Sequence, residues 1–351
     1  MILTEVDDLS ADKDWLRLWR SDDHQHANYS VTSLAVGAAH YTRLYYLPAE
    51  RDVSEYRPCA ERFVPHHLVA SGPDGPVAGL ALTVEVLPGR HRLSAYGRPL
   101  MLVEDRTAPA RLRRQAAAAI HTRLQELTEH YGAERYHARD YLVGGEISPL
   151  TEVLLRHGGV SRHHFTQTVD LRPPAEERFA ELRKNFRKIL RRERGGFALD
   201  VVTAREVTRA HLDDFVRLHL EFFGKTLRTR TSWDSILASV RADEGFMVVG
   251  RQDDRPVSMA YFAVSDRYCL YASGVNDADS YGSGLSHRVL WRAMEHARAL
   301  GCVHFELGEQ LYPGMYPDLP EKFRAIGHFK AGFSNTTAAR LDVFSAPLEA
   351  P

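Results

Sequence analysis

The sequence predicts an α/β protein of two tandem halves, each with a central, mostly antiparallel mixed sheet flanked by helices. Three observations predict it: two hairpin-like segments 180 residues apart, a similar order of elements after each, and a proline-containing connector between the halves. With 351 residues, 44% of them hydrophobic and 26% charged, the chain is long enough for one large globular domain or two of ordinary size.

The two hairpins are the clearest sign of an internal repeat. Residues 67–85 read HLVASGPDGPVAGLALTVE, and residues 246–265 read FMVVGRQDDRPVSMAYFAVS. The Pro-Val pair at Pro76 falls on the Pro-Val pair at Pro256. In each segment an apolar run, a tight Asp/Gly/Pro turn and a second apolar run predict a β-hairpin.

The elements after each hairpin are expected in the same order, a third strand, a long helix and a fourth strand. In the first half these are residues 92–97, 108–131 and 134–138, and in the second half residues 267–274, 285–300 and 302–307. Gly132 and Gly301 suit the left-handed position that closes a helix. The connector LRPPAE, at residues 171–176, predicts one domain over residues 1–171 and another over residues 172–351.

Composition excludes several classes of protein. The net charge of -1 gives no global attraction to nucleic acid or membrane, so a polyanion would need a local patch. The N-terminal residues do not resemble a signal peptide, and no run of 18 apolar residues predicts a membrane span. The 18 histidines do not have the spacing of a zinc site. We therefore expect a cytoplasmic protein with no bound metal.

A local cationic patch is predicted at residues 182–195, LRKNFRKILRRERG. Helical spacing places its basic residues in adjacent rows, while Phe179, Leu182, Phe186, Ile189 and Leu190 form an apolar stripe. The cations that we expect to bind phosphate are Arg183, Arg187, Lys188 and Arg191. The ligand would be a tRNA backbone, CoA or a nucleotide-linked acceptor. The alternative interpretation is an ordinary solvated face.

Four segments of the second half together resemble a known family. They are the basic segment above, YGSGLSHRVLWRAMEHARAL at residues 281–300, FELG at 305–308 and GHFKAGF at 327–333. Their order is similar to that of the Fem family, whose members have tandem GNAT-like halves. The resemblance covers about residues 65–345. It implies an acyltransferase that moves an amino acid from aminoacyl-tRNA to an amine.

The loop before residue 285 separates two possible donors. GNAT enzymes that bind acetyl-CoA carry Q/R-x-x-G-x-G/A, whereas this chain has DSYGSG at residues 279–284. The acidic residue disfavours acyl-CoA, but Gly282, Ser283 and Gly284 before a helix still predict an anion site. An ordinary glycine-rich loop is the alternative.

Candidate catalytic residues follow from the same segments. In the resembled family a lysine matching Lys330 lies at the transfer site, where a cation would stabilise the acyl carbonyl oxygen. Its apolar neighbours place Lys330 partly inward at the start of a strand; a snorkelling surface lysine is the alternative.

Two glutamates could supply the proton acceptor. Glu306 and Glu309 lie at a strand end, where a carboxylate could take a proton from the attacking amine, or pair with an arginine such as Arg324. Candidate residues lining the substrate cleft are Tyr261, Tyr271, Tyr281 and Phe329, although such tyrosines are more often part of the core.

The expected function is therefore an N-acyltransferase that transfers an aminoacyl group, from aminoacyl-tRNA, to the amine of a small-molecule or peptide acceptor. No tightly bound cofactor is expected, since the donor is already activated. The alternative donor is acyl-CoA or an acyl carrier protein. A non-catalytic RNA-binding module is the third possibility.

Overall fold

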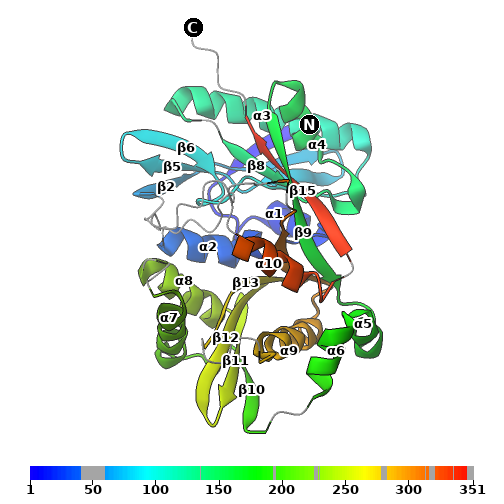
Figure 1. Cartoon of the computed structure of the whole chain (residues 1–351). Coiled ribbons are helices and arrows are strands. Elements are labelled where there is room, and N and C mark those ends of the chain that lie inside the picture. The colour runs from blue at the N-terminus through cyan, green and yellow to red at the C-terminus, as the bar shows by residue number, and fades with distance from the viewer. Residues whose placement is uncertain are drawn as a thin grey trace.

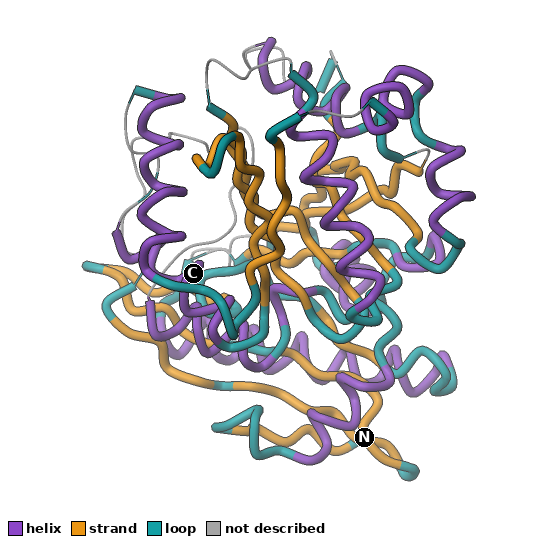
Figure 2. The backbone as a smooth tube through the Cα atoms, turned by 90° about the horizontal axis from the view of Figure 1, so that it is seen from below, coloured by secondary structure: helices purple, strands orange, loops and turns teal. Residues whose placement is uncertain are grey.

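The computed structural model describes residues 1–40, 60–134, 136–192, 195–224, 228, 230–277, 283–312, 314–315, 321–334 and 336–345. Figure 1 shows the first half of the chain at the top and the second half at the bottom. Strands run through the middle of the molecule with helices on either side (Figure 2). None of the described helices is long and apolar enough to cross a membrane.

A mixed sheet of eight strands extends through both halves, in the order β10-β11-β12-β13-β14-β9-β15-β8. All neighbouring strands are antiparallel except β13 and β14. The strands are β10 (Phe197–Val202), β11 (Gly245–Gln252), β12 (Arg255–Val264), β13 (Tyr268–Asn276), β14 (His304–Gln310), β9 (Val160–Asp170), β15 (Thr336–Phe344) and β8 (His137–Asp140).

Helices cover both faces of this sheet in the second half. Alternating residues of β11 point to opposite faces, so Val248 packs in a cluster with α9 (Leu285–Ala299), while Val249 packs with α7 (Arg209–Phe223) and α8 (Arg230–Arg241). Two short helices, α5 (Ala175–Glu181) and α6 (Lys184–Arg191), lie on the α9 side. Helix α10 (Glu321–Lys330) packs against β14.

The first half has a smaller antiparallel sheet, in the order β1-β3-β4-β7. Leu68 faces helix α3 (Ala110–Tyr131) and Val69 faces helix α1 (Lys13–Ser21), again by strand alternation. The strands of this sheet are β1 (Ile2–Val6), β3 (His67–Gly72), β4 (Gly75–Leu80) and β7 (Leu102–Glu104). A separate three-stranded sheet consists of β2 (Arg62–Pro65), β5 (Thr83–Leu87) and β6 (Arg90–Ser94). The remaining helices of this half are η1 (Ala27–Tyr29), α2 (Val31–His40), η3 (Val143–Gly145) and α4 (Pro149–Arg156).

The predicted repeat of hairpins is present in the structure. Strands β3 and β4 are separated by the turn between Gly72 and Gly75, and β11 and β12 by the turn between Gln252 and Arg255, which is the same offset of 180 residues. Gly132 has φ +55° and closes α3, and Gly301 has φ +100° just after α9. Turn and cap residues therefore specify these boundaries locally.

The strand expected at residues 92–97 is present as β6 at residues 90–94, but it is not the third strand of the repeated sheet. Strand β6 pairs with β5 in the separate three-stranded sheet. The strand that pairs with β4, as β13 pairs with β12, is β7 at Leu102–Glu104. Strand alternation looks the same whichever neighbour a strand selects, so the sequence pattern could not identify the partner.

The two halves exchange strands. Strand β9, which follows α4 in the first half, pairs with β14 of the second half. Strand β15, which follows α10 in the second half, pairs with β8 of the first half and with β9. The boundary predicted at residue 171 therefore falls directly after β9, a strand of the first half that is hydrogen-bonded to β14 and β15 of the second half.

Candidate functional site

Strands β13 and β14 of the large sheet pair in parallel and separate part-way along their length. Strand β13 pairs with β14 from Tyr268 to Leu270, opposite His304 to Glu306. Beyond Glu306 the pairing of β14 with β9 shifts, and Gly308 adopts a φ of +96°. Glycine tolerates this conformation, which turns β14 away from β13. We call this place the strand-separation site.

Lys330 lies at the strand-separation site, but it comes from a helix. It is the last residue of α10, so its expected position at a strand start is wrong. A Cβ atom added to Gly308 would lie 2.7 Å from the Lys330 Nζ atom, and Nζ lies 5.6 Å from the centre of the Tyr271 ring. A side chain at position 308 would therefore displace the ammonium group.

Tyr271 forms the opposite wall of the site, whereas Tyr261 does not. Burial raises the pKa of Tyr271 to about 12, so its phenol is neutral. A Cβ on Gly274 would collide with its hydroxyl group, so glycine makes room for the ring. Tyr261 is 7% exposed and packs in the cluster under α7 and α8, on the other face of the sheet.

Glu306 is held in a buried hydrogen-bond network between the halves. Its side chain accepts hydrogen bonds from the Tyr268 hydroxyl (2.6 Å) and the Thr166 hydroxyl (2.9 Å). The His26 Nε2 atom lies 3.3 Å from it, and His26 Nδ1 accepts from Asn28 N, so Nε2 carries the donated proton. These contacts join β14 to β13, β9 and η1.

The environment of Glu306 keeps its carboxyl ionised. Burial by itself would raise the pKa, but the hydrogen bond from His26, the charge of Arg340 and the Tyr268 hydroxyl outweigh burial and hold the pKa well below its usual range. A carboxylate with so low a pKa is a weak proton acceptor. The catalytic role of Glu306 stays a prediction.

Glu309 has a different partner from the one suggested by the sequence. Its carboxylate lies 3.2 Å from Arg340 Nη2, with 14% of the side chain exposed. Arg324 instead pairs with Glu321 on the same helix, at 2.6 Å. Glu309 is thus the more accessible of the two candidate carboxylates, since Glu306 is 3% exposed.

The basic segment lies against the N-terminus of α9, but the segment is not the single helix that the sequence predicted. Residues 182 and 183 have extended backbone and divide α5 from α6, so Phe179 lies on α5. Gly284 has φ +83°, and a Cβ on it would lie 2.5 Å from Ile189 Cγ2. Arg288 of α9 donates to the Ile189 carbonyl at 2.9 Å. Ser283 and Gly284 therefore adjoin the end of α6.

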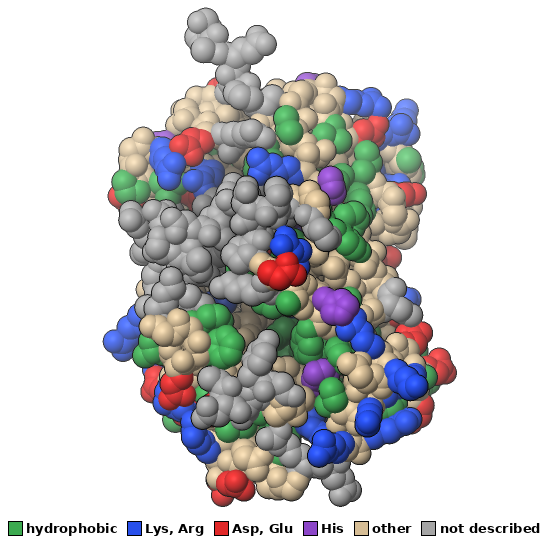
Figure 3. Space-filling view, in the orientation of Figure 1, with side chains coloured by type: hydrophobic (Ala, Val, Ile, Leu, Met, Phe, Trp, Pro, Cys, Tyr) green, Lys and Arg blue, Asp and Glu red, His purple; other side chains and the backbone are tan. Residues whose placement is uncertain are grey.

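The basic side chains at α6 differ in whether they form hydrogen bonds within the protein or are exposed to solvent. Arg183 donates to the His328 carbonyl at 3.1 Å, and Arg187 donates to the Ala180 carbonyl. Lys188 and Arg191 are exposed, with Arg191 5.2 Å from the centre of the Phe179 ring. Figure 3 shows basic side chains gathered at the lower right, over the corner of α5, α6 and α9. Tyr281 and Gly282 lie outside the described residues.

Phe329 lies in an aromatic cluster that fixes the end of α10. Its ring centre is 5.6 Å from Phe186 on α6, 5.0 Å from His287 on α9 and 5.4 Å from Phe333. A Cβ on Gly332 would collide with Phe186, so this close approach needs glycine. The cluster joins α6, α9 and α10 and thereby positions Lys330 beside Gly308.

The sequence did not indicate the residues that surround Glu306. His26 is 280 positions away, and Thr166 is 140 positions away. Neither belongs to a motif, so no sequence signal could have identified them. Within the part of the chain that the structure describes, no group of three or more His, Cys, Asp or Glu is arranged to hold a metal ion.

Residues 177–316 match the family model described as Acetyltransferase (GNAT) domain. The fold is similar to that of FemX, with a TM-score of 0.62 and 10% identity over 88% of this chain and 94% of that one. The chain therefore has the tandem GNAT-like fold of FemX. Its second half carries the GNAT acyltransferase domain.

Two further solved structures have the same fold. A tandem GNAT protein from the clavulanic acid biosynthesis pathway has a TM-score of 0.52 and 12% identity, and covers 99% of both chains. The C-terminal domain of a putative lysylphosphatidylglycerol synthetase from Agrobacterium fabrum has a TM-score of 0.52 and 18% identity over 80% of this chain and 84% of that one. No curated protein matches the sequence significantly.

Proposed function

We propose that this GNAT-type acyltransferase takes an aminoacyl group from aminoacyl-tRNA and transfers it to the amine of a small-molecule or peptide acceptor. The observation that carries the proposal is the exposed basic face of α6, held against the N-terminus of α9. The Fem-type fold and the neighbour named for lysylphosphatidylglycerol synthesis support it.

The basic face suits a polyanion better than a single pyrophosphate. Lys188 and Arg191 point to solvent on α6, and the backbone at Ser283 and Gly284 adds the N-terminal dipole of a 15-residue helix. Several cations spread along one surface can contact successive phosphates of an RNA backbone, with salt-dependent affinity.

The strand-separation site would hold the reacting ester. The acceptor amine attacks the ester carbonyl, a C–N bond forms, and the C–O bond to the tRNA ribose breaks. In this scheme Lys330 Nζ donates a hydrogen bond to the carbonyl oxygen as it becomes negative. Glu309 takes the proton that the amine loses, and the ribose oxygen leaves with a proton from solvent or from the same carboxyl. Glu306 holds β14 in position.

An acyl-CoA donor is the second candidate. The retained Ser283-Gly284 start of α9 favours it, as does the similar tandem GNAT protein, whose description names AcCoA. The two donors predict opposite results when acyl-CoA competes with RNA.

The first test is binding of the purified full chain to charged bulk bacterial tRNA near physiological salt, with acyl-CoA as competitor. We expect binding that acyl-CoA does not displace. The double variant Lys188→Glu and Arg191→Glu should lower the affinity for tRNA at least tenfold. It should also reduce the slope of log affinity against log salt concentration by the equivalent of about two phosphate contacts. The matched control is the double charge reversal of Arg111 and Arg114, two exposed residues of α3 in the first half.

The second test separates binding from chemistry. Transfer of a labelled amino acid from tRNA to a mixture of free amino acids and small peptides should fall about 10²–10³-fold in Lys330→Ala, with tRNA affinity unchanged. Lys13→Ala, on α1, is the control and should transfer normally. Absence of tRNA binding, together with thermal protection by acyl-CoA, would refute the tRNA donor and favour the second candidate.

A further inference from the structure

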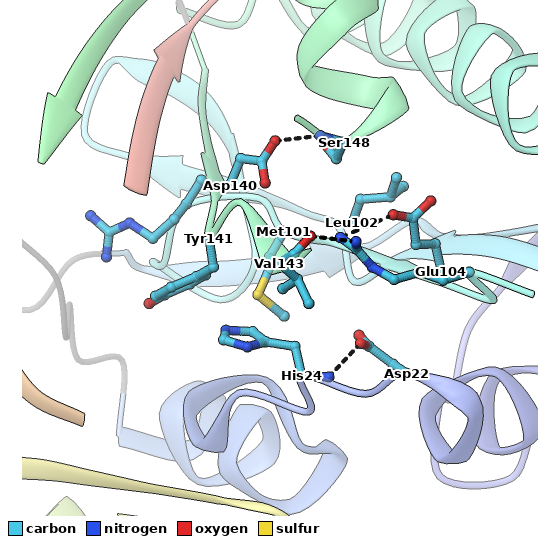
Figure 4. Close-up of a pocket in the computed structure, with 11 residues that line it drawn as sticks. Asp22, His24, Met101, Leu102, Glu104, Asp140, Tyr141, Val143 and Ser148 are labelled. Atoms are coloured by element: carbon cyan, nitrogen blue, oxygen red, sulfur yellow. Dashed lines mark hydrogen bonds and ion pairs between the residues drawn. The ribbon is translucent and has the colours of Figure 1, made fainter. Parts of the chain in front are cut away.

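The first half contains a small cavity of about 30 Å³ (Figure 4). It lies among the residues after α1, strand β7 and the chain that leaves β8. Its lining residues include Asp22, His24, Glu104, Arg106 and Arg139.

The position of this cavity matches that of the strand-separation site in the second half. The chain before β7 runs parallel to β8, with Leu100 N donating to the His137 carbonyl (2.8 Å) and Arg139 N donating to the Leu100 carbonyl (2.7 Å). Past these bonds the two segments separate, and the cavity opens between residues 102–106 and 139–143. Each half thus has a place where its parallel pair of strands separates, and in the first half this place is a cavity.

Asp22 supplies a buried carboxyl group with an open acceptor position. It follows α1, is 4% exposed and points into the cavity (Figure 4). One oxygen accepts a hydrogen bond from His24 N at 2.8 Å, and no other described residue donates to the carboxyl. Burial raises the pKa of Asp22 to about 7. The charged groups facing it are Asp23 on its own loop, Glu104 at the end of β7 and Arg106 just after β7.

Glu104 and His24 supply two further acceptors. Glu104 is 4% exposed, and its Oε2 accepts no hydrogen bond from the described residues, with Arg113 Nη1 at 3.5 Å. Burial raises the pKa of Glu104 and lowers that of His24. His24 Nε2 is likewise buried without a hydrogen-bond partner in the described part of the chain. Unsatisfied polar atoms of this kind cost free energy unless a ligand or water completes them.

The cations at the cavity are already committed to protein partners. Arg106 donates to the Val143 carbonyl at 2.6 Å, and its Nη2 atom lies 3.4 Å from Glu104 Oε1. Arg139 donates to both oxygens of Asp342, at 2.7 and 3.1 Å. The open positions at this cavity are therefore acceptors, which favours a ligand that is cationic and donates hydrogen bonds.

We propose that the cavity is a binding site for the ammonium group of a primary amine, with Asp22 as its counter-charge and Glu104 Oε2 as a further acceptor. A primary ammonium has three N–H donors, which equals the number of open acceptors on Asp22, Glu104 and His24. The cavity has room for at least one such group, since an accessible volume of about 10–15 Å³ is enough to hold a water molecule. The remainder of the ligand extends from the mouth of the cavity. This site is separate from the strand-separation site, and the proposal does not depend on the donor.

The test uses the full chain with n-butylammonium as probe and n-butanol as its neutral analogue. At pH 8 the amine should raise the midpoint of thermal unfolding, and butanol at the same concentration should not. The increase should disappear in Asp22→Asn and persist in Asp23→Asn, because the Asp23 side chain is 68% exposed and pairs with Arg267. Glu104→Gln is the second variant, should Asp22→Asn fail to fold.

Calorimetry supplies an independent readout. Because the pKa of Asp22 is about 7 in the free protein, binding of a cation at pH 7 should release about half a proton, seen as a difference between phosphate and Tris buffers. Absence of both the midpoint shift and proton release would overturn the proposal. A shift that survives in Asp22→Asn and in Glu104→Gln would overturn it as well.

Discussion

Asp342 should be among the most destabilising positions to mutate, because it neutralises charges buried between the two halves. It lies on β15 and is 0% exposed. Arg139 Nε and Nη2 donate to its two oxygens at 2.7 and 3.1 Å, and His137 and His164 each lie 3.0 Å away. Arg340 Nη2 lies at 3.7 Å. Asp342→Ala leaves two arginines, each at most 3% exposed, without this counter-charge.

Removing one partner of a buried ion pair costs about 3–5 kcal/mol. That is a large share of a typical unfolding free energy of about 5–15 kcal/mol. Burial would raise the pKa of Asp342, but Arg139, His137 and His164 outweigh it and hold the pKa well below its usual range. Because the folded pKa lies below the unfolded pKa of about 4, the ionised carboxyl stabilises the fold above that pH. This stabilisation is lost as the pH falls from there toward the folded pKa. The full effect is therefore present at pH 7.5.

Urea unfolding at pH 7.5, followed by tryptophan fluorescence and circular dichroism together, measures this loss. The control is Asp200→Ala on β10, where a half-exposed carboxylate pairs with Arg251 alone at 2.8 Å. Such a surface pair contributes about 0–1 kcal/mol. If Asp342→Ala costs no more than Asp200→Ala, the reasoning that buried charges at this junction depend on Asp342 is refuted.

Three further changes test the site and the fold. Gly274→Ala should displace the Tyr271 ring and lower transfer by about 10–100-fold, whereas Gly195→Ala, where a Cβ meets nothing within 4 Å, should transfer normally. Burial lowers the pKa of His219 to about 3, so the neutral imidazole stabilises the fold fully above the unfolded pKa of about 6.5. The free energy of unfolding should fall by up to about 2 kcal/mol from this group by pH 5, and His219→Gln should flatten the dependence of that free energy on pH. Glu306→Gln should reduce the transfer rate less than about tenfold and leave the pH profile of transfer unchanged. If the variant loses the acidic limb of that profile, Glu306 is the proton acceptor instead.

Much of the fold was predictable because its signals are local. The turns that precede Pro76 and Pro256, and Gly132 at the end of α3, specify their own boundaries. The failures concern long-range partners. Residues 92–97 had a correct strand pattern but a wrongly assigned neighbour, and Lys330 had apolar flanks that suit a strand edge and a helix end equally well.

The candidate site was predictable only in part. Lys330 and Gly284 were candidates from motifs and Tyr271 was a candidate for lining the cleft, and the structure places Lys330 and Tyr271 together. Tyr261 had the same residue type and strand context as Tyr271, but it faces α7 and α8. A β-bulge between Tyr261 and Phe262 changes the register with β13, and strand alternation cannot show which face of a doubly covered sheet contains the site.

The sequence by itself determined the two hairpins, the long helices with their terminating glycines, the basic face of α6 and the resemblance to tandem GNAT proteins. Each of these depends on residues a few positions apart, where periodicity and turn chemistry act directly. Only the tertiary structure decided that β9 and β15 are exchanged, that His26 meets Glu306 across 280 positions, and that Asp22 and Glu104 share a cavity. These long-range contacts form when packed layers bring side chains from distant parts of the chain together, and no local sequence pattern specifies them.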